Sequence, residues 1–257
     1  MAESATELEP RPDGVDRPKK IAMIIAERIV HQIAADDLKP GAKLPPEREM
    51  LAEFGVGRGT LREALRFLEL QGVIALRPGP KGGPVVASPS DRQLASTLAL
   101  LLEMDHTPYA DILSARVTLE PVLAAQAAER ITDAQLTVLQ DECDQMRATL
   151  DRPELFAEQH HRFHRLIVEA SGNHVFLLVM SSLHWIADGS VPWTAFPARE
   201  RKAVSARHDQ ILQALRDHDP DAAYQAMLEH DRKYERYATK THPDALKAPV
   251  RWGSRLT

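Results

Sequence analysis

The segment from Arg58 to Gln71 constrains the local fold most, because it combines an apolar helix face with a charged one. Its apolar residues follow the i, i+3, i+4, i+7 spacing of a helix that buries one side, and they are Leu61, Ala64, Leu65 and Leu68. The other side carries Arg58, Gly59, Arg62 and Arg66. Gly72 follows, at a position where helices often end in a left-handed conformation. The segment predicts an amphipathic helix that displays arginines.

A short β-hairpin is expected directly after this helix. The apolar runs at 73–76 and 84–87 have the length of strands, and three glycines lie in the turn between them. Two further helices are expected upstream, over about 18–38 and 46–55, with Pro46 in the first turn of the second. Three helices followed by a hairpin predict a winged helix-turn-helix, whose third helix enters the major groove of DNA.

The charge distribution supports a contact with nucleic acid. The chain has a net charge of -5, but residues 17–85 hold 12 lysines and arginines against 8 acidic residues, a local charge of +4. A basic segment joined to an acidic one indicates a nucleic-acid contact confined to one domain. Arg58 and Arg62, four residues apart on one face, can reach guanine edges and phosphates. A solvated basic face on an ordinary helical domain is the alternative; the apolar back face, the glycine-rich hairpin and the local charge together favour DNA.

Length and composition fit two modest domains in a reducing compartment. The chain has 257 residues, and its single cysteine, Cys143, excludes an intramolecular disulfide. No apolar stretch approaches the roughly 18 residues that span a membrane, and the acidic first ten residues exclude a secretory signal. We therefore expect a cytoplasmic, nucleoid-associated protein with no membrane partner. The expected divisions are a flexible tail at 1–16, the DNA-binding domain at 17–87, a helical effector-binding and dimerisation domain at 88–241, and a C-terminal tail at 242–257.

The C-terminal half predicts an all-α bundle of about seven helices, so the chain as a whole is mainly α. Strand signals are few, and turn chemistry separates the helical segments. The expected spans are 91–103, 109–130, 133–149, 153–171, 174–188, 198–217 and 220–240.

Histidines from three of these helices lie on apolar faces that must turn inward. They are His160, His208 and His230, and His164 lies beside the stripe of His160; the four are called the histidine cluster below. Several buried imidazoles are costly unless something pairs with them, and a metal held by neutral imidazoles is the simplest solution. Hydrogen-bonded core histidines are the alternative. No such convergence is evident for His174, His184, His218 and His242, which we expect to be structural or exposed.

Arg116 is a further candidate for the interior of the bundle. It shares a helical stripe with apolar residues, and a buried arginine needs an anion. Glu120, one turn later, is an internal candidate for that anion, and a bound ligand is the other.

Three segments of the N-terminal half resemble the signature of GntR-type bacterial regulators. They are Leu44-Pro-Pro-Glu-Arg-Glu, Gly55-Val-Gly-Arg-Gly-Thr-Leu-Arg-Glu-Ala-Leu and Leu68-Glu-Leu-Gln-Gly-Val-Ile. The resemblance implies operator contacts at Arg48, Arg58, Gly59, Thr60, Arg62 and Gly79. The chain departs from the family at Gly57, where Ser or Thr usually caps the helix; glycine is a tolerable cap, at a cost of about 1 kcal/mol or less.

The C-terminal half resembles the FCD effector domain of the FadR subfamily over about residues 92–237. The segments that match are Ile112-Leu-Ser-Ala-Arg116, Phe163-His164, Ala170-Ser-Gly-Asn173 and the pair His208 and His230. The resemblance implies a divalent metal on His164, His208 and His230, and a carboxylate effector held by Arg116 and the metal, with Asn173 nearby. His160 stands where the family usually has an acidic ligand. As a fourth imidazole it favours a transition metal, zinc first and nickel second; as a residue beside the site it only lines the pocket.

These observations together predict a homodimeric transcriptional regulator, expected to be a repressor. It would bind inverted-repeat double-stranded DNA, and a small organic acid would modulate that binding. A metal-free regulator that senses an acyl or fatty-acid ligand is the alternative. A metal-dependent enzyme with an accessory DNA-binding domain is a weaker one, because His161 stands where metalloproteases need glutamate after the first histidine. We therefore expect no enzyme activity and no catalytic residues.

Overall fold

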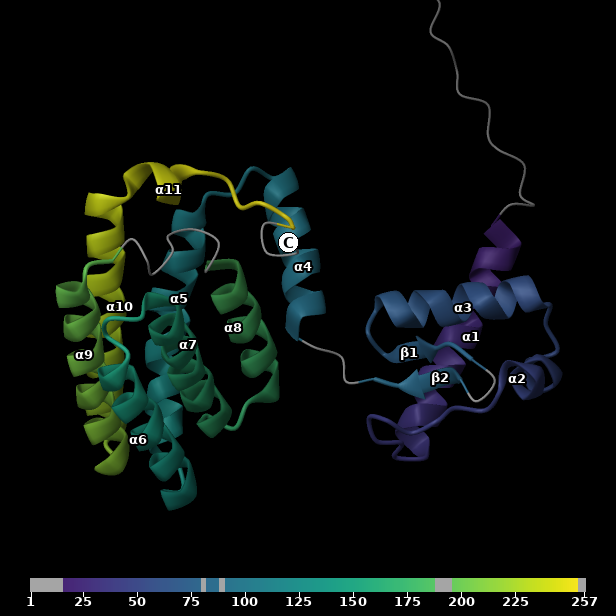
Figure 1. The fold of residues 1–257 in the computed structure, drawn as a ribbon, viewed down its shortest axis with the longest axis horizontal. Helices are drawn as coiled ribbons and strands as arrows, with labels where there is room; N and C mark the ends of the chain where they lie inside the picture. The colour runs from purple at the N-terminus through teal and green to yellow at the C-terminus, as the bar shows by residue number, and fades with distance from the viewer. Residues whose placement is uncertain (1–15, 80–81, 88–90, 188–195, 254–257) are drawn as a thin grey trace, which may run out of the picture. The chain divides into compact units, whose positions relative to one another are not determined.

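The computed structural model of the chain describes residues 16–79, 82–87, 91–187 and 196–253 (Figure 1). The chain forms two compact units, Met1–Gln93 and Leu94–Thr257. The tail expected at 1–16 lies outside the described residues except for its last residue. The expected domain boundary between residues 87 and 88 adjoins the segment 88–90, which is also outside them.

The N-terminal unit is a winged helix-turn-helix, as predicted. Its three helices are α1 (Asp16–Ala35), α2 (Glu47–Phe54) and α3 (Arg58–Leu70). Strands β1 (Ile74–Arg77) and β2 (Gly83–Val86) follow as an antiparallel hairpin, in which Ile74 lies opposite Val86. Each strand begins within one residue of its predicted start.

The core of this unit forms where α3 packs on α1. The four apolar residues predicted to face inward on α3 are each at most 2% exposed. Their partner face on α1 is Ala22, Ile25, Ala26 and Ile29. Ile21 and Ile24 of the same helix remain about two-fifths exposed, and Ala22 and Ala26 are buried on the face toward α3.

The end of α3 is fixed by a glycine turn. Gly72 has a φ of 69°, a left-handed conformation that side chains rarely adopt, as the sequence predicted. Its N–H donates to the carbonyl of Glu69 at 2.9 Å, and the N–H of Val73 donates to the carbonyl of Leu68 at 2.9 Å. This paired arrangement is a Schellman motif, and it turns the chain from α3 into the hairpin.

The C-terminal unit is a bundle of helices, as predicted, and each expected span agrees with the structure to within two residues at either end. Its long helices are α4 (Asp91–Met104), α5 (Tyr109–Ala128), α6 (Asp133–Ala148), α7 (Pro153–Ala170), α8 (His174–Ala187), α9 (Ala198–Arg216) and α10 (Pro220–Thr241). In Figure 1, α10 lies along α5 and α9, and α7 packs against α5, α6 and α8. None of the described helices is long and apolar enough to cross a bilayer.

The segment after His242 contains regular structure that the sequence did not predict. A short helix, α11 (Pro243–Lys247), is followed by a stretch that lies against the start of α5. Leu246 and Val250 are buried, and the N–H of Val250 donates to the carbonyl of Thr107 at 2.8 Å. Two buried apolar residues, backbone hydrogen bonds, and side-chain hydrogen bonds from Arg251 and Trp252 to α4 hold this segment. Its apolar pattern is too short to be recognised in the sequence.

Candidate metal centre and nucleic-acid interface

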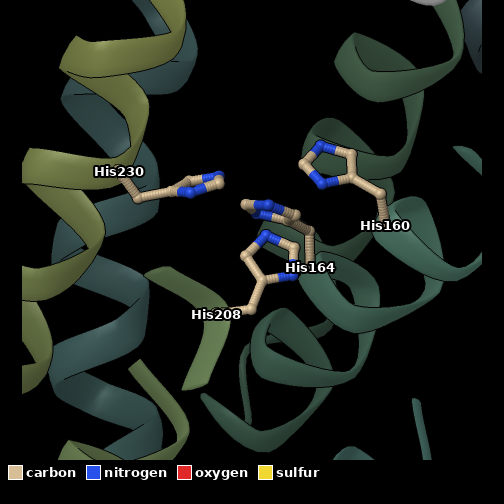
Figure 2. Close-up of side chains that lie close together, drawn as sticks. All are labelled: His160, His164, His208 and His230. Atoms are coloured by element: carbon tan, nitrogen blue, oxygen red, sulfur yellow. The ribbon is translucent and has the colours of Figure 1, made fainter. Parts of the chain in front are cut away.

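The structure brings all four members of the histidine cluster together. His160 and His164 come from adjacent turns of α7, His208 from α9 and His230 from α10, and Figure 2 shows their rings pointing toward one another. One nitrogen from each ring lies within 4.8 Å of the others, and every residue is at most 2% exposed. The cluster therefore has the size and burial of a metal site.

Apolar stripes turn these histidines inward. On α7, Phe156, Phe163 and Ile167 are fully buried beside the two histidines. On α9, Ile211 and Leu215 follow His208 at helical spacing and are also fully buried. The ring of Phe163 stacks on that of His208 with 4.2 Å between centroids. Hydrophobic burial therefore sets the direction of the imidazoles before any metal is present.

The cluster is neutral at physiological pH. Burial lowers the pKa of each histidine, and neighbouring imidazoles lower it further, His164 acting on His160 and His230 on His208. The same causes keep the pKa of His230 well below its usual value. A neutral imidazole has a lone pair, so the rings are in the state that binds metals.

Several ring nitrogens of the cluster are buried without a hydrogen bond to any described residue. They are Nε2 of His164, both nitrogens of His208 and Nδ1 of His230. Leaving a buried polar atom unpaired costs about 1–3 kcal/mol. A divalent metal would use these lone pairs, and an all-imidazole set suits zinc or nickel rather than magnesium or calcium. The residues present therefore fit the metal that the resemblance implies.

Glu120 links the cluster to Arg116. Its carboxylate accepts hydrogen bonds from Arg116 Nε at 2.6 Å, from His184 Nε2 at 3.0 Å and from His164 Nδ1. A hydrogen bond at Nδ1 fixes the tautomer of His164 and leaves its Nε2 free to bind a metal. Of the two anions considered for Arg116, the internal one is present.

Glu120 is ionised despite its burial. Burial alone would raise its pKa, but the charge of Arg116, with help from His164, lowers that pKa well below the usual range. Arg116 uses only Nε for this pair, and its terminal nitrogens donate to no described residue; the ring of Tyr234 lies 6.0 Å from its central carbon. The guanidinium thus retains donors for a second anion.

His184 is part of this network, and sequence reasoning did not identify it. It is 6% exposed, and burial lowers its pKa to about 4, because the attraction of Glu120 offsets only part of the effect. Helix α8 is apolar around most of its circumference, so no polar face marks which way His184 points. The only available signal was its spacing of four residues from the buried Met180.

Asn173 lies at the start of α8. Its side-chain oxygen accepts from the N–H of Val175 at 3.0 Å and of Phe176 at 3.3 Å. His184 is eleven residues further along the same helix, about 16 Å away at 1.5 Å per residue. The structure does not bring Asn173 to the network around Glu120, so its effector contact stays a prediction.

The residues predicted to contact DNA lie on the winged helix-turn-helix. Arg48, Arg58, Gly59, Arg62 and Gly79 are exposed and Thr60 is half-buried. Arg62 Nε lies 3.4 Å from Glu47 Oε2, which ties the arginine loosely to α2. Gly57 precedes α3 in an extended conformation and provides no side-chain cap, so the first N–H groups of α3 are available to an anion. Beside them, between α1 and α3, is a cavity of about 640 Å³ whose lining includes Lys19, Arg62 and Arg66.

Comparison with known proteins agrees with both halves of the structure. Residues 22–81 match the pattern of the bacterial regulatory proteins of the gntR family, and residues 111–233 match that of the FCD domain. The HTH-type transcriptional regulator YcbG of Bacillus subtilis is 35% identical over 85% of this chain and 89% of its own length. The HTH-type transcriptional repressor NanR of Escherichia coli K12 is 30% identical over 82% of each.

A solved structure supports the same assignment. The GntR protein of Streptococcus agalactiae superimposes with a TM-score of 0.68 at 29% identity, over 84% of this chain and all of the other. The relatives are transcriptional regulators and not enzymes, in line with the prediction. The chain belongs to the gntR family of bacterial transcriptional regulators, with an N-terminal DNA-binding domain and a C-terminal FCD effector domain.

Proposed function

We propose that this regulator depends on a divalent transition metal, zinc first and nickel second, bound by the histidine cluster. The observation that carries the proposal is the convergence of four buried imidazoles, three of which (those of His164, His208 and His230) have a buried nitrogen without a hydrogen bond to any described residue. A metal-free acyl pocket, the alternative, would leave one imidazole lone pair on each of these three rings unpaired, at a cost of about 1–3 kcal/mol each.

The effector that we propose is a small carboxylate. Arg116 is buried against Glu120 with unused terminal donors, which can bind a carboxylate in a bidentate manner. Glu120 also contacts His164 of the histidine cluster, so such an anion would lie close to the metal. The metal would supply positive charge that attracts the acid.

On DNA, we propose that the chain acts as a homodimer of the FadR subfamily and represses transcription from inverted-repeat operators in the cytoplasm. A single recognition helix buries too little surface for a high-affinity specific site, whereas two can contact both half-sites. We propose direct operator contacts by the residues listed here: Arg48, Arg58, Gly59, Thr60, Arg62 and Gly79. To release DNA, the acid must bind the DNA-free state more tightly than the DNA-bound one.

Metal content per chain, measured by plasma mass spectrometry on untagged protein, tests the metal. We expect about one ion in the wild type, none in His208→Ala and a reduced amount in His160→Ala. His174→Ala is the matched control, because His174 is exposed on the same unit. A wild type that takes up neither added zinc nor added nickel would refute the metal.

A further inference from the structure

Asp231 is a buried acid with incomplete hydrogen bonding beside the candidate centre. It follows His230 on α10 and is 5% exposed. Its Oδ1 lies 3.9 Å from His230 Nε2, which is beyond hydrogen-bond distance. Its Oδ2 is buried and accepts no hydrogen bond from any described residue. Asp231 therefore has an acceptor that the described part of the fold does not use.

We propose that Asp231 accepts a hydrogen bond from the effector, which is then an acid that also carries a hydroxyl or ammonium group. This inference rests on the proposed carboxylate effector and adds the second functional group that the site recognises.

Arg116 and Asp231 share one interior without pairing. Tyr234, one turn after Asp231 on α10, has its ring 6.0 Å from the central carbon of Arg116, so Asp231 and Arg116 approach the same region of the interior. No described ion pair within 4.0 Å joins Arg116 to Asp231, although Arg116 has unused terminal donors. A ligand with a carboxylate for Arg116 and a hydrogen-bond donor for Asp231 would satisfy both groups.

An aspartate at this buried position lowers the stability of the fold unless a partner binds its carboxyl group. A buried polar group without a partner destabilises a fold, and an apolar side chain of similar volume would not. Its oxygens are also not among the ligand atoms that gather within 4.8 Å of one another in the histidine cluster. A role toward a bound molecule accounts for an acid here better than a role in packing or in holding the metal.

The test compares matched acids on the zinc-loaded full-length chain by titration calorimetry. Succinate, malate and aspartate share a skeleton and differ by a hydrogen, a hydroxyl or an ammonium group; glutarate, 2-hydroxyglutarate and glutamate repeat the series with one more carbon. In the wild type we expect the hydroxylated or aminated acid of a series to bind about tenfold more tightly than its parent. Asp231→Leu should abolish this preference without changing the affinity for the parent acid.

Two further variants serve as controls. Asp231→Asn keeps an acceptor oxygen and should keep the preference for malate. Asp221→Leu makes the apolar change at an exposed position of the same helix and should have no effect. We also expect Asp231→Leu to retain its zinc and to melt no lower than the wild type, because it removes an unpaired buried carboxyl group.

The outcomes separate this inference from the proposed function. Equal binding of the parent and substituted acids in the wild type would refute the role of Asp231 while leaving the carboxylate effector intact. Loss of zinc in Asp231→Leu would make Asp231 a metal-site residue, and a lower melting temperature would make it a structural one; either result overturns the inference. Failure of every acid to bind would refute the carboxylate effector itself.

Discussion

Mild acid should destabilise the metal-free helical unit, because its histidine cluster is buried in the neutral state. The folded-state pKa of each of these histidines is lowered by burial below the ordinary histidine value of 6.5. Below pH 6.5 the unfolded chain therefore takes up protons that the folded chain does not. The unfolding free energy is highest above this pH and falls as the pH decreases.

The size of the effect follows from the number of histidines. A histidine that is neutral when folded and has an ordinary pKa when unfolded costs about 0.4 kcal/mol at pH 6.5 and about 1.4 kcal/mol at pH 5.5. His160, His208 and His230, whose pKa values are lowered furthest, together lower the stability by about 3 kcal/mol over that unit of pH, and His164 acts in the same direction. His184 adds a contribution of the same sign, because its pKa is lowered to about 4. A loss of this size is comparable to the whole stability of many domains.

Urea denaturation at pH 7.5, 6.5 and 5.5, followed by tryptophan fluorescence, measures this loss. All three tryptophans lie after residue 94, so the signal reports on the C-terminal unit alone. His174→Gln, at an exposed position, should show the same pH dependence as the wild type. Zinc should raise the stability at pH 7.5, since it binds only the folded, neutral cluster. Unfolding free energies of the metal-free chain that agree within about 1 kcal/mol at pH 7.5 and 5.5 would refute the burial argument.

Three further substitutions test the remaining parts of the site. Arg62→Ala should weaken binding to an operator selected from random DNA by about 1–3 kcal/mol in a mobility-shift assay, and unchanged affinity would remove Arg62 from the interface. Gly57→Ser should raise the stability of the N-terminal unit by a few tenths of a kcal/mol in thermal melts, because no atom lies within 4 Å of a new Cβ and serine caps helices. Glu120→Gln should lower zinc affinity about 10–100-fold in competition with a chromophoric chelator; unchanged affinity would mean that Glu120 does not position His164.

Most of the fold could be predicted because its helices carry redundant signals. In α3, the apolar stripe and the glycine after it point to the same boundaries, and Gly72 adopts the predicted left-handed conformation. In α1 the signal was ambiguous, since Ile21, Ile24 and Ile25 all fall near helical spacing and only Ile25 is buried. Which of them faces α3 depends on how the two helices pack, and periodicity within α1 alone does not determine that.

The site was predictable only where a histidine interrupts an apolar stripe. His160 and His208 both do so, and the structure places both in the cluster. The partners of the cluster gave weaker signals. His184 lies on a helix that is apolar on most sides, so the sequence does not predict which way it points. Asp231 follows His230, and no apolar periodicity marks it as facing the interior. Their roles depend on how α5, α8 and α10 pack against one another. The periodicity of a single helix gives no information about that packing.

The imidazole at position 160 changes the charge of the proposed site, and this gives the proposed effector a larger part in holding the metal. Four neutral imidazoles cancel none of a divalent metal's charge, and the charges of Arg116 and Glu120 cancel each other. Asp231 offers little compensation, because burial raises its pKa and favours the neutral form. Uncompensated charge in a buried site is costly, so an anion bound there is stabilised more strongly than it would be beside an aspartate ligand. Since coupling between two ligands is reciprocal, the acid that is attracted by the metal must strengthen metal binding by the same factor.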